Sequence, residues 1–283
     1  MRHTYECPMR WADLDLLGHV NNVVYVDYLQ EARVDMLQVH ARTHATDALA
    51  EATLVVSHQV TYVKPLLFDF APVHIDCWVT EIRAAAFTLA YEVYKLDAAG
   101  ERVVHLTATT VLAPYVFATE SPRRLTPAEK ESLAVYLEAQ PTPKVEYGEP
   151  RHTDLGHYPV NVRFSDVDIY RHVNNVKYFE YFQEARIASL GRVEQEMGGR
   201  RPSMVVAQTD VEYRKPLLFR PEPYDIYTWL SHLGNRSMVL EAEILDAGER
   251  LARGRFVLVF FDPETERSIA PSDDVRAAFE KLA

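Results

Sequence analysis

The chain has 283 residues, of which 48% are hydrophobic and 25% charged, and its formal net charge at pH 7 is −11. These values are typical of a globular protein that is long enough for two domains of about 140 residues each. A negative charge without a long run of Lys or Arg argues against nucleic acid or an anionic membrane surface as the main partner. No apolar stretch reaches the roughly 18 residues that a membrane-spanning helix needs, so we expect no membrane insertion.

The two cysteines, Cys7 and Cys77, lack a spacing typical of metal sites. The first residues of the chain also lack the apolar stretch of a secretory signal. We therefore expect a reduced, cytoplasmic protein. An Asp followed four residues later by a His, a pattern that occurs twice, is alone a weak metal signal, and we predict that no metal is bound.

The first half of the chain is predicted to contain a strand over residues 4–11 and a helix over residues 22–38, whose apolar side chains recur at helical spacing. Four runs rich in Val, Thr, Tyr and Phe then indicate strands over residues 54–63, 73–82, 87–96 and 103–116. Thr126 and Pro127 give the signal of a helix N-terminus, and this short helix should end near residue 137.

The second half repeats this order of elements. Residues 139–156 come first, with spaced Pro and Gly and no hydrophobic period, as is typical of an extended linker. The predicted elements that follow are a strand at 158–165, a helix at 174–190, strands near 203–213, 224–233, 236–246 and 251–262, and a helix after Pro271. We therefore predict a domain of residues 1–138, a linker of residues 139–156 and a domain of residues 157–283.

The two halves also repeat each other residue by residue. Residues 10–33 match residues 163–186 at 14 of 24 positions, and residues 60–68 match residues 211–219 at seven of nine. Polar residues are among the identities, so the repeat is an internal duplication. Because each copy presents one apolar helix face, we predict that the copies pack as a pseudo-dimer, and a homo-oligomer of the two-domain chain is a further option.

The most informative repeated stretch is Asp-x-Asp-x-x-x-His-Val-Asn-Asn, at residues 13–22 and 166–175, directly before each predicted long helix. Asn is a favoured N-cap, and the N–H groups and dipole of the first helical turn favour negative charge. These donors could hold an oxyanion while an Asp beside them acts as base or nucleophile. The candidates are Asp15 and Asp168 for the carboxylate and Asn21, Asn22, Asn174 and Asn175 for the helix start.

The other polar residues of the stretch have several interpretations. His19 and His172 could orient a substrate, hydrogen-bond the carboxylate, assist proton transfer to a leaving group, or only support the turn. Asp13 and Asp166 are expected to hydrogen-bond the backbone of the turn and hold its geometry.

A strand, this turn, a long helix and a meander of four strands together resemble the hotdog fold, in which an antiparallel sheet wraps one central helix. The turn is similar to that of the 4-hydroxybenzoyl-coenzyme A thioesterase family, and its second copy also resembles plant acyl-carrier-protein thioesterases, which are tandem hotdogs. The resemblance implies an α+β fold of two tandem hotdog domains with catalytic carboxylates at Asp15 and Asp168. The plant enzymes have an Asn two residues after this Asp, where the present chain has Leu17 and Tyr170.

The resemblance implies hydrolysis of an acyl thioester, with acyl-coenzyme A as the expected substrate, to a free acid and a thiol. Coenzyme A would be part of the substrate, so we expect no separate cofactor. Lys64, Lys215 and Arg171 could then approach the phosphates of coenzyme A, although a solvated Lys is the commoner outcome. Two alternatives are a hotdog hydratase or dehydratase acting on acyl thioesters, and a non-catalytic acyl-thioester-binding protein.

Overall fold

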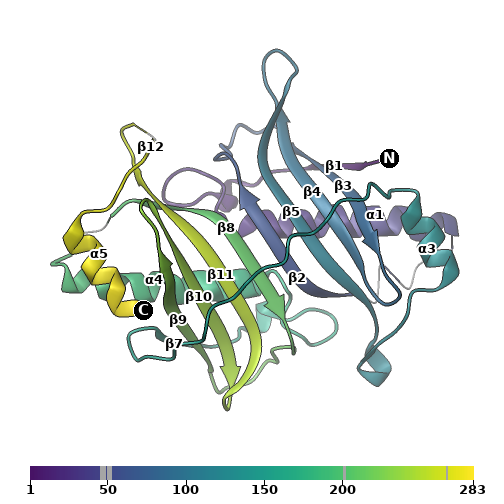
Figure 1. Ribbon diagram of the computed structural model, residues 1–283. Coiled ribbons are helices and arrows are strands. Elements are labelled where there is room, and N and C mark those ends of the chain that lie inside the picture. The colour runs from purple at the N-terminus through teal and green to yellow at the C-terminus, as the bar shows by residue number, and fades with distance from the viewer. Residues whose placement is uncertain (45–48, 50–52, 200–201, 266) are drawn as a thin grey trace. The chain divides into compact units, whose positions relative to one another are not determined.

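The computed structural model describes the whole chain except residues 45–48, 50–52, 200–201 and 266, and it forms two compact units, Met1–Lys144 and Val145–Ala283 (Figure 1). Each unit has an antiparallel sheet and one long helix that packs against two of its strands. Within the described residues, no helix is both long enough and apolar enough to cross a bilayer.

The sheet of the first unit has the strand order β1-β3-β4-β5-β2. Its long helix, α1, packs against β1 and β3, and a short helix, α3, covers the same region. The elements of this unit are β1 (His3–Cys7), α1 (Val24–His44), β2 (Thr53–Tyr62), β3 (Val73–Ile82), β4 (Phe87–Leu96), β5 (Arg102–Val116), β6 (Ser121–Pro122) and α3 (Pro127–Ala134).

The second unit repeats this arrangement with the strand order β7-β9-β10-β11-β8, and α4 packs against β7 and β9. Its elements are β7 (His157–Val160), α4 (Lys177–Glu196), β8 (Met204–Tyr213), β9 (Tyr224–Leu233), β10 (Ser237–Asp246), β11 (Glu249–Asp262), β12 (Arg267–Ser268) and α5 (Asp273–Phe279). The α+β architecture predicted from the sequence, a sheet around one helix in each half, is present in both units.

The cores lie between each long helix and the inner face of its sheet. β4 is buried along most of its length, and Phe87, Leu89 and Val93 are fully buried. On α1 the buried residues include Tyr25, Leu29, Ala32 and Met36, spaced three or four apart. Burial of each large apolar side chain contributes about 1.5–3 kcal/mol, and this packing fixes the helix against the sheet.

Several element ends differ from the prediction. β1 ends at Cys7 rather than near residue 11, because Pro8 has no N–H to donate to a neighbouring strand. α1 continues to His44, because no Gly or Pro stops the helix near residue 38. The predicted end at residue 38 reflects only the loss of the apolar period there. α4 likewise reaches Glu196 and ends before Gly198, whose φ of 71° is the left-handed conformation usual after a helix.

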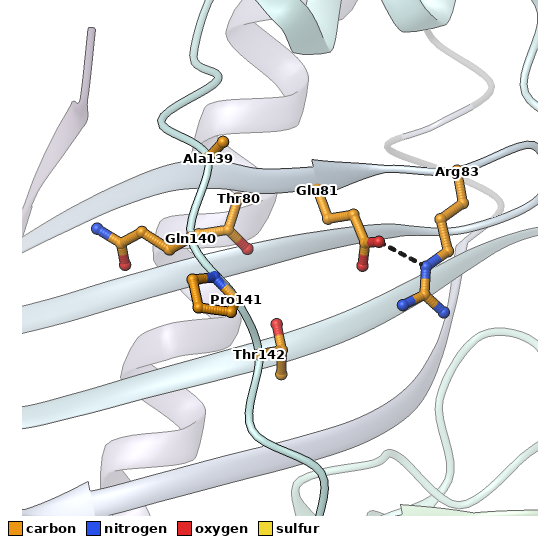
Figure 2. A pocket seen from close by; sticks show the side chains of 7 residues that line it. All are labelled: Thr80, Glu81, Arg83, Ala139, Gln140, Pro141 and Thr142. Atoms are coloured by element: carbon orange, nitrogen blue, oxygen red, sulfur yellow. Dashed lines mark ion pairs between the residues drawn. The ribbon is translucent and has the colours of Figure 1, made fainter.

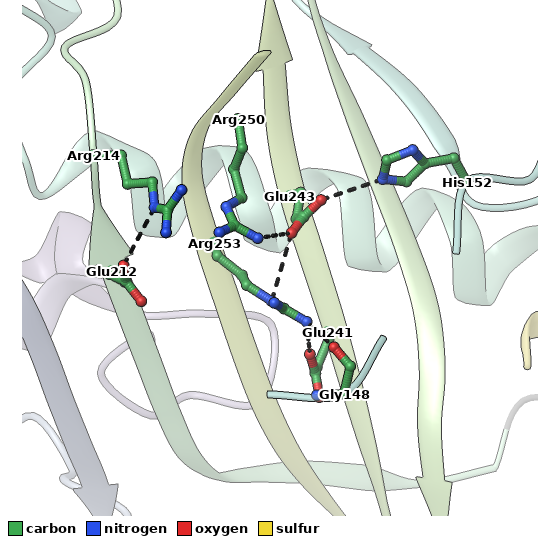
Figure 3. Close-up of polar contacts among 8 residues, drawn as sticks. All are labelled: Gly148, His152, Glu212, Arg214, Glu241, Glu243, Arg250 and Arg253. Atoms are coloured by element: carbon green, nitrogen blue, oxygen red, sulfur yellow. Dashed lines mark hydrogen bonds and ion pairs between the residues drawn. The ribbon is translucent and has the colours of Figure 1, made fainter. Parts of the chain in front are cut away.

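The stretch 139–156, which we predict to be a linker, has no helix or strand and ends in a turn at residues 154–156. In the first unit, Gln59 donates a hydrogen bond to the Pro143 carbonyl at 2.8 Å. In the second unit, Gly148 N–H donates to Glu241 at 2.9 Å, and Arg253 donates to the Gly148 carbonyl (Figure 3). Each part of this stretch is therefore held by its own unit.

Candidate functional site

The Asp-to-Asn motif forms the same tight loop in each unit. In the first unit, Asp15 N–H donates to the His19 carbonyl at 2.8 Å, and Gly18 N–H donates to the Asp15 carbonyl at 3.0 Å. The second loop repeats both bonds at 2.8 and 3.0 Å, between Asp168, His172 and Arg171. The duplicated sequence thus encodes a duplicated backbone conformation.

Each loop fixes its second Asp through one carboxylate oxygen. Asp15 Oδ1 accepts hydrogen bonds from Leu17 N–H at 2.8 Å and from His19 N–H at 3.2 Å. Asp168 Oδ1 accepts the equivalent bonds at 2.9 and 3.3 Å, from Tyr170 N–H and His172 N–H. Both side chains are half-buried, and neither Oδ2 has a hydrogen-bond partner among the residues that the structure describes. One oxygen of each carboxylate is held and the other can accept a proton.

The histidines contact these carboxylates through the backbone. His19 also pairs with Leu67 as an isolated bridge, and His172 pairs in the same way with Leu218. In the described part of the chain, the His19 ring makes no hydrogen bond with Asp15. Of the roles that the sequence left open, orientation of a substrate, proton transfer and support of the turn remain predictions.

The first Asp of each motif is buried and holds the loop. Asp13 is 1% exposed and accepts hydrogen bonds from Arg10 N–H at 2.8 Å and from the Tyr28 hydroxyl at 2.5 Å. Burial alone would raise the pKa of Asp13, but the hydrogen bonds from Arg10 and Tyr28 outweigh burial and lower it. Asp166 repeats both contacts, with Arg163 N–H at 2.9 Å and the Tyr181 hydroxyl at 2.6 Å. As expected from the sequence, these carboxylates hold the turn.

The first Asn of each pair holds the turn that leads into the long helix. Asn21 Oδ1 accepts from Val23 N–H at 3.3 Å, and the Asn21 carbonyl accepts from Val24 N–H at 3.0 Å. Asn22 N–H has no partner among the hydrogen bonds of the described residues, so it can donate to a ligand. In the second unit, Asn174 accepts the equivalent bonds from Val176 N–H and Lys177 N–H at 3.4 and 2.9 Å. The N-cap position of α4 is Val176, which makes no side-chain capping bond, so the predicted cap at Asn174 lies two residues before the N-cap.

Two strand tyrosines that the sequence analysis did not single out hold the second Asn of each pair. The Tyr62 hydroxyl donates to the Asn22 carbonyl at 2.8 Å, and the Tyr213 hydroxyl donates to the Asn175 carbonyl at 2.9 Å. Both belong to the second repeated stretch, in which the Tyr stands two residues before the Lys-Pro pair. The repeated Tyr is therefore the feature of the sequence from which these two contacts could have been predicted.

The segment after each Lys-Pro pair supports the loop. Val20 N–H donates to the Leu66 carbonyl at 2.9 Å, and Val173 N–H donates to the Leu217 carbonyl at the same distance. Leu66 and Leu217 are fully buried, which fixes these carbonyls. The lysines that precede them, Lys64 and Lys215, lie at the surface.

Exposed apolar side chains surround the supporting segment of each loop. Trp11 is 74% exposed and meets the Phe68 ring edge-on, with ring centroids 5.7 Å apart. Phe164, 81% exposed, meets Phe219 in the same manner at 5.9 Å. The repeat places an aromatic residue at both positions of each unit, and this pattern is visible in the sequence.

The described residues also include two cysteines and a surface pocket that lie outside the two motifs. Burial raises the pKa of Cys7 to about 12 and also raises that of Cys77, so neither thiol is ionised at neutral pH. Among the described residues, no group of three or more His, Cys, Asp or Glu is arranged to hold a metal ion. A surface pocket of about 420 Å³ is lined by residues 80–81, 83 and 139–142 and contains no motif residue (Figure 2).

Comparison with known proteins identifies the family. Residues 9–136 and 162–279 match the Thioesterase-like superfamily, and each segment contains one copy of the loop. The chain belongs to this superfamily. The resemblance to thioesterases that the sequence indicates in both halves is thereby confirmed.

Two curated relatives match less than half of the chain. YsmA of Bacillus subtilis strain 168, an uncharacterized protein, is 31% identical over 120 residues, which are 41% of this chain and 78% of YsmA. FadM of Escherichia coli strain K12, a long-chain acyl-CoA thioesterase, is 28% identical over 127 residues, which are 44% of this chain and 96% of FadM. FadM is therefore about as long as one of the two units.

A solved structure covers most of this chain. The 12:0-ACP thioesterase from Umbellularia californica has a TM-score of 0.68 and 15% identity, with 91% of this chain and 93% of that chain covered. At this identity the likeness concerns the fold alone. This likeness agrees with the predicted fold of two tandem hotdog domains.

Proposed function

We propose that the protein hydrolyses acyl-coenzyme A to a free acid and coenzyme A, at the Asp15 loop and at the Asp168 loop. The observation that carries this proposal is how the Asp15 and Asp168 carboxylates are hydrogen-bonded and placed. Each is held by two backbone N–H groups on Oδ1, and each lies on the loop that leads into a long helix. A held carboxylate with one open oxygen suits proton abstraction or nucleophilic attack.

In the first route, Asp15 Oδ2 takes a proton from a water molecule as that water attacks the thioester carbonyl carbon. The carbonyl oxygen becomes negatively charged and accepts a hydrogen bond from the Asn22 N–H, which the helix dipole reinforces. When the tetrahedral intermediate collapses, the C–S bond breaks and the thiolate receives the proton from the Asp15 carboxyl. The Asp168 loop would follow the same course at the start of α4.

In the second route, Asp15 Oδ2 itself attacks the carbonyl carbon, the thiolate leaves, and water hydrolyses the resulting acyl anhydride. The routes differ in the origin of one product oxygen. In a single turnover in ¹⁸O-labelled water, the first route puts the label into the acid. In the second route, attack of water on the aspartyl carbonyl gives unlabelled acid and a labelled enzyme carboxylate.

The function is tested by thiol release from a panel of acyl-coenzyme A esters that differ in chain length and aromaticity, without added metal or cofactor. Release of free thiol with formation of the acid is the expected result. An absorbance change with an unsaturated ester but no thiol release would instead indicate a hydratase. Saturable binding without either change would indicate a binding protein, and both outcomes would contradict the proposal.

A further inference from the structure

The two loops are flanked by equivalent strand ends that carry different charges. Val63 N–H and Lys64 N–H donate to the His105 carbonyl at 2.9 and 3.2 Å, and the backbone of Arg214 and Lys215 makes the same bonds to Leu251 at 2.8 and 3.1 Å. These matched bonds make His105 and Leu251 equivalent positions. Counting two residues back along each strand, Val103 in the first unit corresponds to Glu249 in the second.

In the second unit, this strand end is neutralised. Lys215 Nζ lies 2.5 Å from Glu249, and Arg214 Nε lies 3.5 Å from Glu212, the pair drawn in Figure 3. Two cations therefore face two carboxylates, and the second unit presents no net charge here.

The first unit lacks both carboxylates. Thr61 and Val103 occupy the positions of Glu212 and Glu249, and Val63 occupies that of Arg214. Lys64 is exposed and has no ion-pair partner among the residues that the structure describes. It lies two residues before Leu66, whose carbonyl binds the loop at Val20 N–H. Within the described residues, Lys64 is therefore an unpaired cation next to the segment that supports the Asp15 loop.

The two loops also differ in charge, but here the additional cation belongs to the second unit. Gly18, with a φ of 76°, stands three residues after Asp15, whereas Arg171, with a φ of 65°, stands three residues after Asp168. This left-handed conformation suits Gly and strains a residue with a side chain. Arg171 is exposed and forms no ion pair within the described residues. In the second unit the unpaired cation, Arg171, therefore lies on the loop itself. The first unit has Gly18 at this position, where the backbone is not strained.

We propose that the two sites bind the phosphate groups of coenzyme A through different cations, Lys64 at the Asp15 site and Arg171 at the Asp168 site. This inference rests on the proposed function and assigns its anion-binding residues. Charge-assisted hydrogen bonds to phosphate explain why each unit retains one unpaired cation beside its loop. They also explain why the second unit keeps a strained Arg, since backbone strain persists where the side chain has a use.

The test separates the sites first. Asp168→Asn leaves the Asp15 site, and Asp15→Asn leaves the Asp168 site. Lys64→Gln and Arg171→Gly are then made in each background, with Lys215→Gln as the matched control for a paired lysine. Each variant is assayed with an acyl-coenzyme A and with the pantetheine thioester of the same acid, which has no phosphate.

At the Asp15 site, Lys64→Gln should raise KM for the coenzyme A ester about three- to tenfold, the range expected of an exposed charged contact. Arg171→Gly should have this effect only at the Asp168 site. The KM for the pantetheine ester should not change in either variant. Added salt should raise KM for the coenzyme A ester, because salt screens exposed charges.

The melting temperature of the Arg171→Gly variant is a second measurement that tests the inference. Arg171→Gly removes the left-handed strain and should raise Tm by about 1–3 °C, even though it weakens binding of coenzyme A. An unchanged KM for the coenzyme A ester in Lys64→Gln and Arg171→Gly would overturn the inference, as would equal rises with both esters. Absence of thiol release from either ester in the wild-type protein would instead refute the proposed function.

Discussion

Removing the Tyr28 hydroxyl tests whether the buried Asp13 carboxylate stabilises the loop. Tyr28 donates to Asp13 at 2.5 Å, and the acceptor is 1% exposed, so water cannot replace the lost bond. A hydrogen bond to a charged group contributes about 1.5–3 kcal/mol. Because the Phe ring fills the same space, Tyr28→Phe should lower the free energy of unfolding by about this amount.

The effect should depend on pH in one direction. The pKa of Asp13 in the folded protein is below its ordinary value, because the hydrogen bonds from Arg10 and Tyr28 outweigh the effect of burial. A carboxyl with a lowered folded pKa contributes stability above its unfolded pKa of about 3.9, and that stability is lost as pH falls through the folded pKa. The difference between wild type and Tyr28→Phe should therefore shrink below about pH 4.

Urea denaturation at pH 7 and at several lower pH values measures both effects. Tyr181→Phe, which removes the equivalent bond to Asp166, should lower the free energy of unfolding at pH 7 by a similar amount. Tyr62→Phe is the contrasting control, because its hydroxyl donates to the neutral Asn22 carbonyl and its smaller loss should not depend on the charge of Asp13. Unchanged stability at pH 7, or a loss that persists undiminished at low pH, would refute the assigned role of Asp13.

Two further predictions concern the segments that join the elements. An added Cβ at Gly156 would lie 1.9 Å from the Thr228 carbonyl oxygen, so Gly156→Ala should cost at least about 2 kcal/mol, whereas Gly148→Ala, with its nearest neighbour at 3.4 Å, should cost under about 1 kcal/mol. Equal melting temperatures of the two variants would contradict this. Thr126 caps α3 by accepting from Glu129 N–H at 3.2 Å, so Thr126→Ala should cost about 1 kcal/mol, and a calorimetric Tm equal to that of the wild type would be the contrary result.

Because the sequence contains an internal duplication, much of the candidate site could be predicted from it. The two copies of the loop and the Asn caps recur at fixed spacing, and local hydrogen bonds then determine their conformation, as the bonds around Asp15 show. Contacts between residues far apart in the chain could not be predicted from the sequence. Lys215 appeared equivalent to Lys64 until the structure paired it with Glu249, because strand pairing decides which side chains meet. The packing of the two copies as a pseudo-dimer stays a prediction.

Replacing both Asp15 and Asp168 by Asn tests the central claim most directly. An Asn side-chain oxygen can still accept the two backbone N–H bonds that hold each loop, so the fold should be kept while the basic and nucleophilic oxygen is lost. Asp225→Asn, at a partly exposed Asp paired with His157, is the matched control. Turnover of acyl-coenzyme A should fall by about 10² to 10⁴ in the double variant and stay at the wild-type level in the control. Wild-type turnover in a correctly folded double variant would contradict the account.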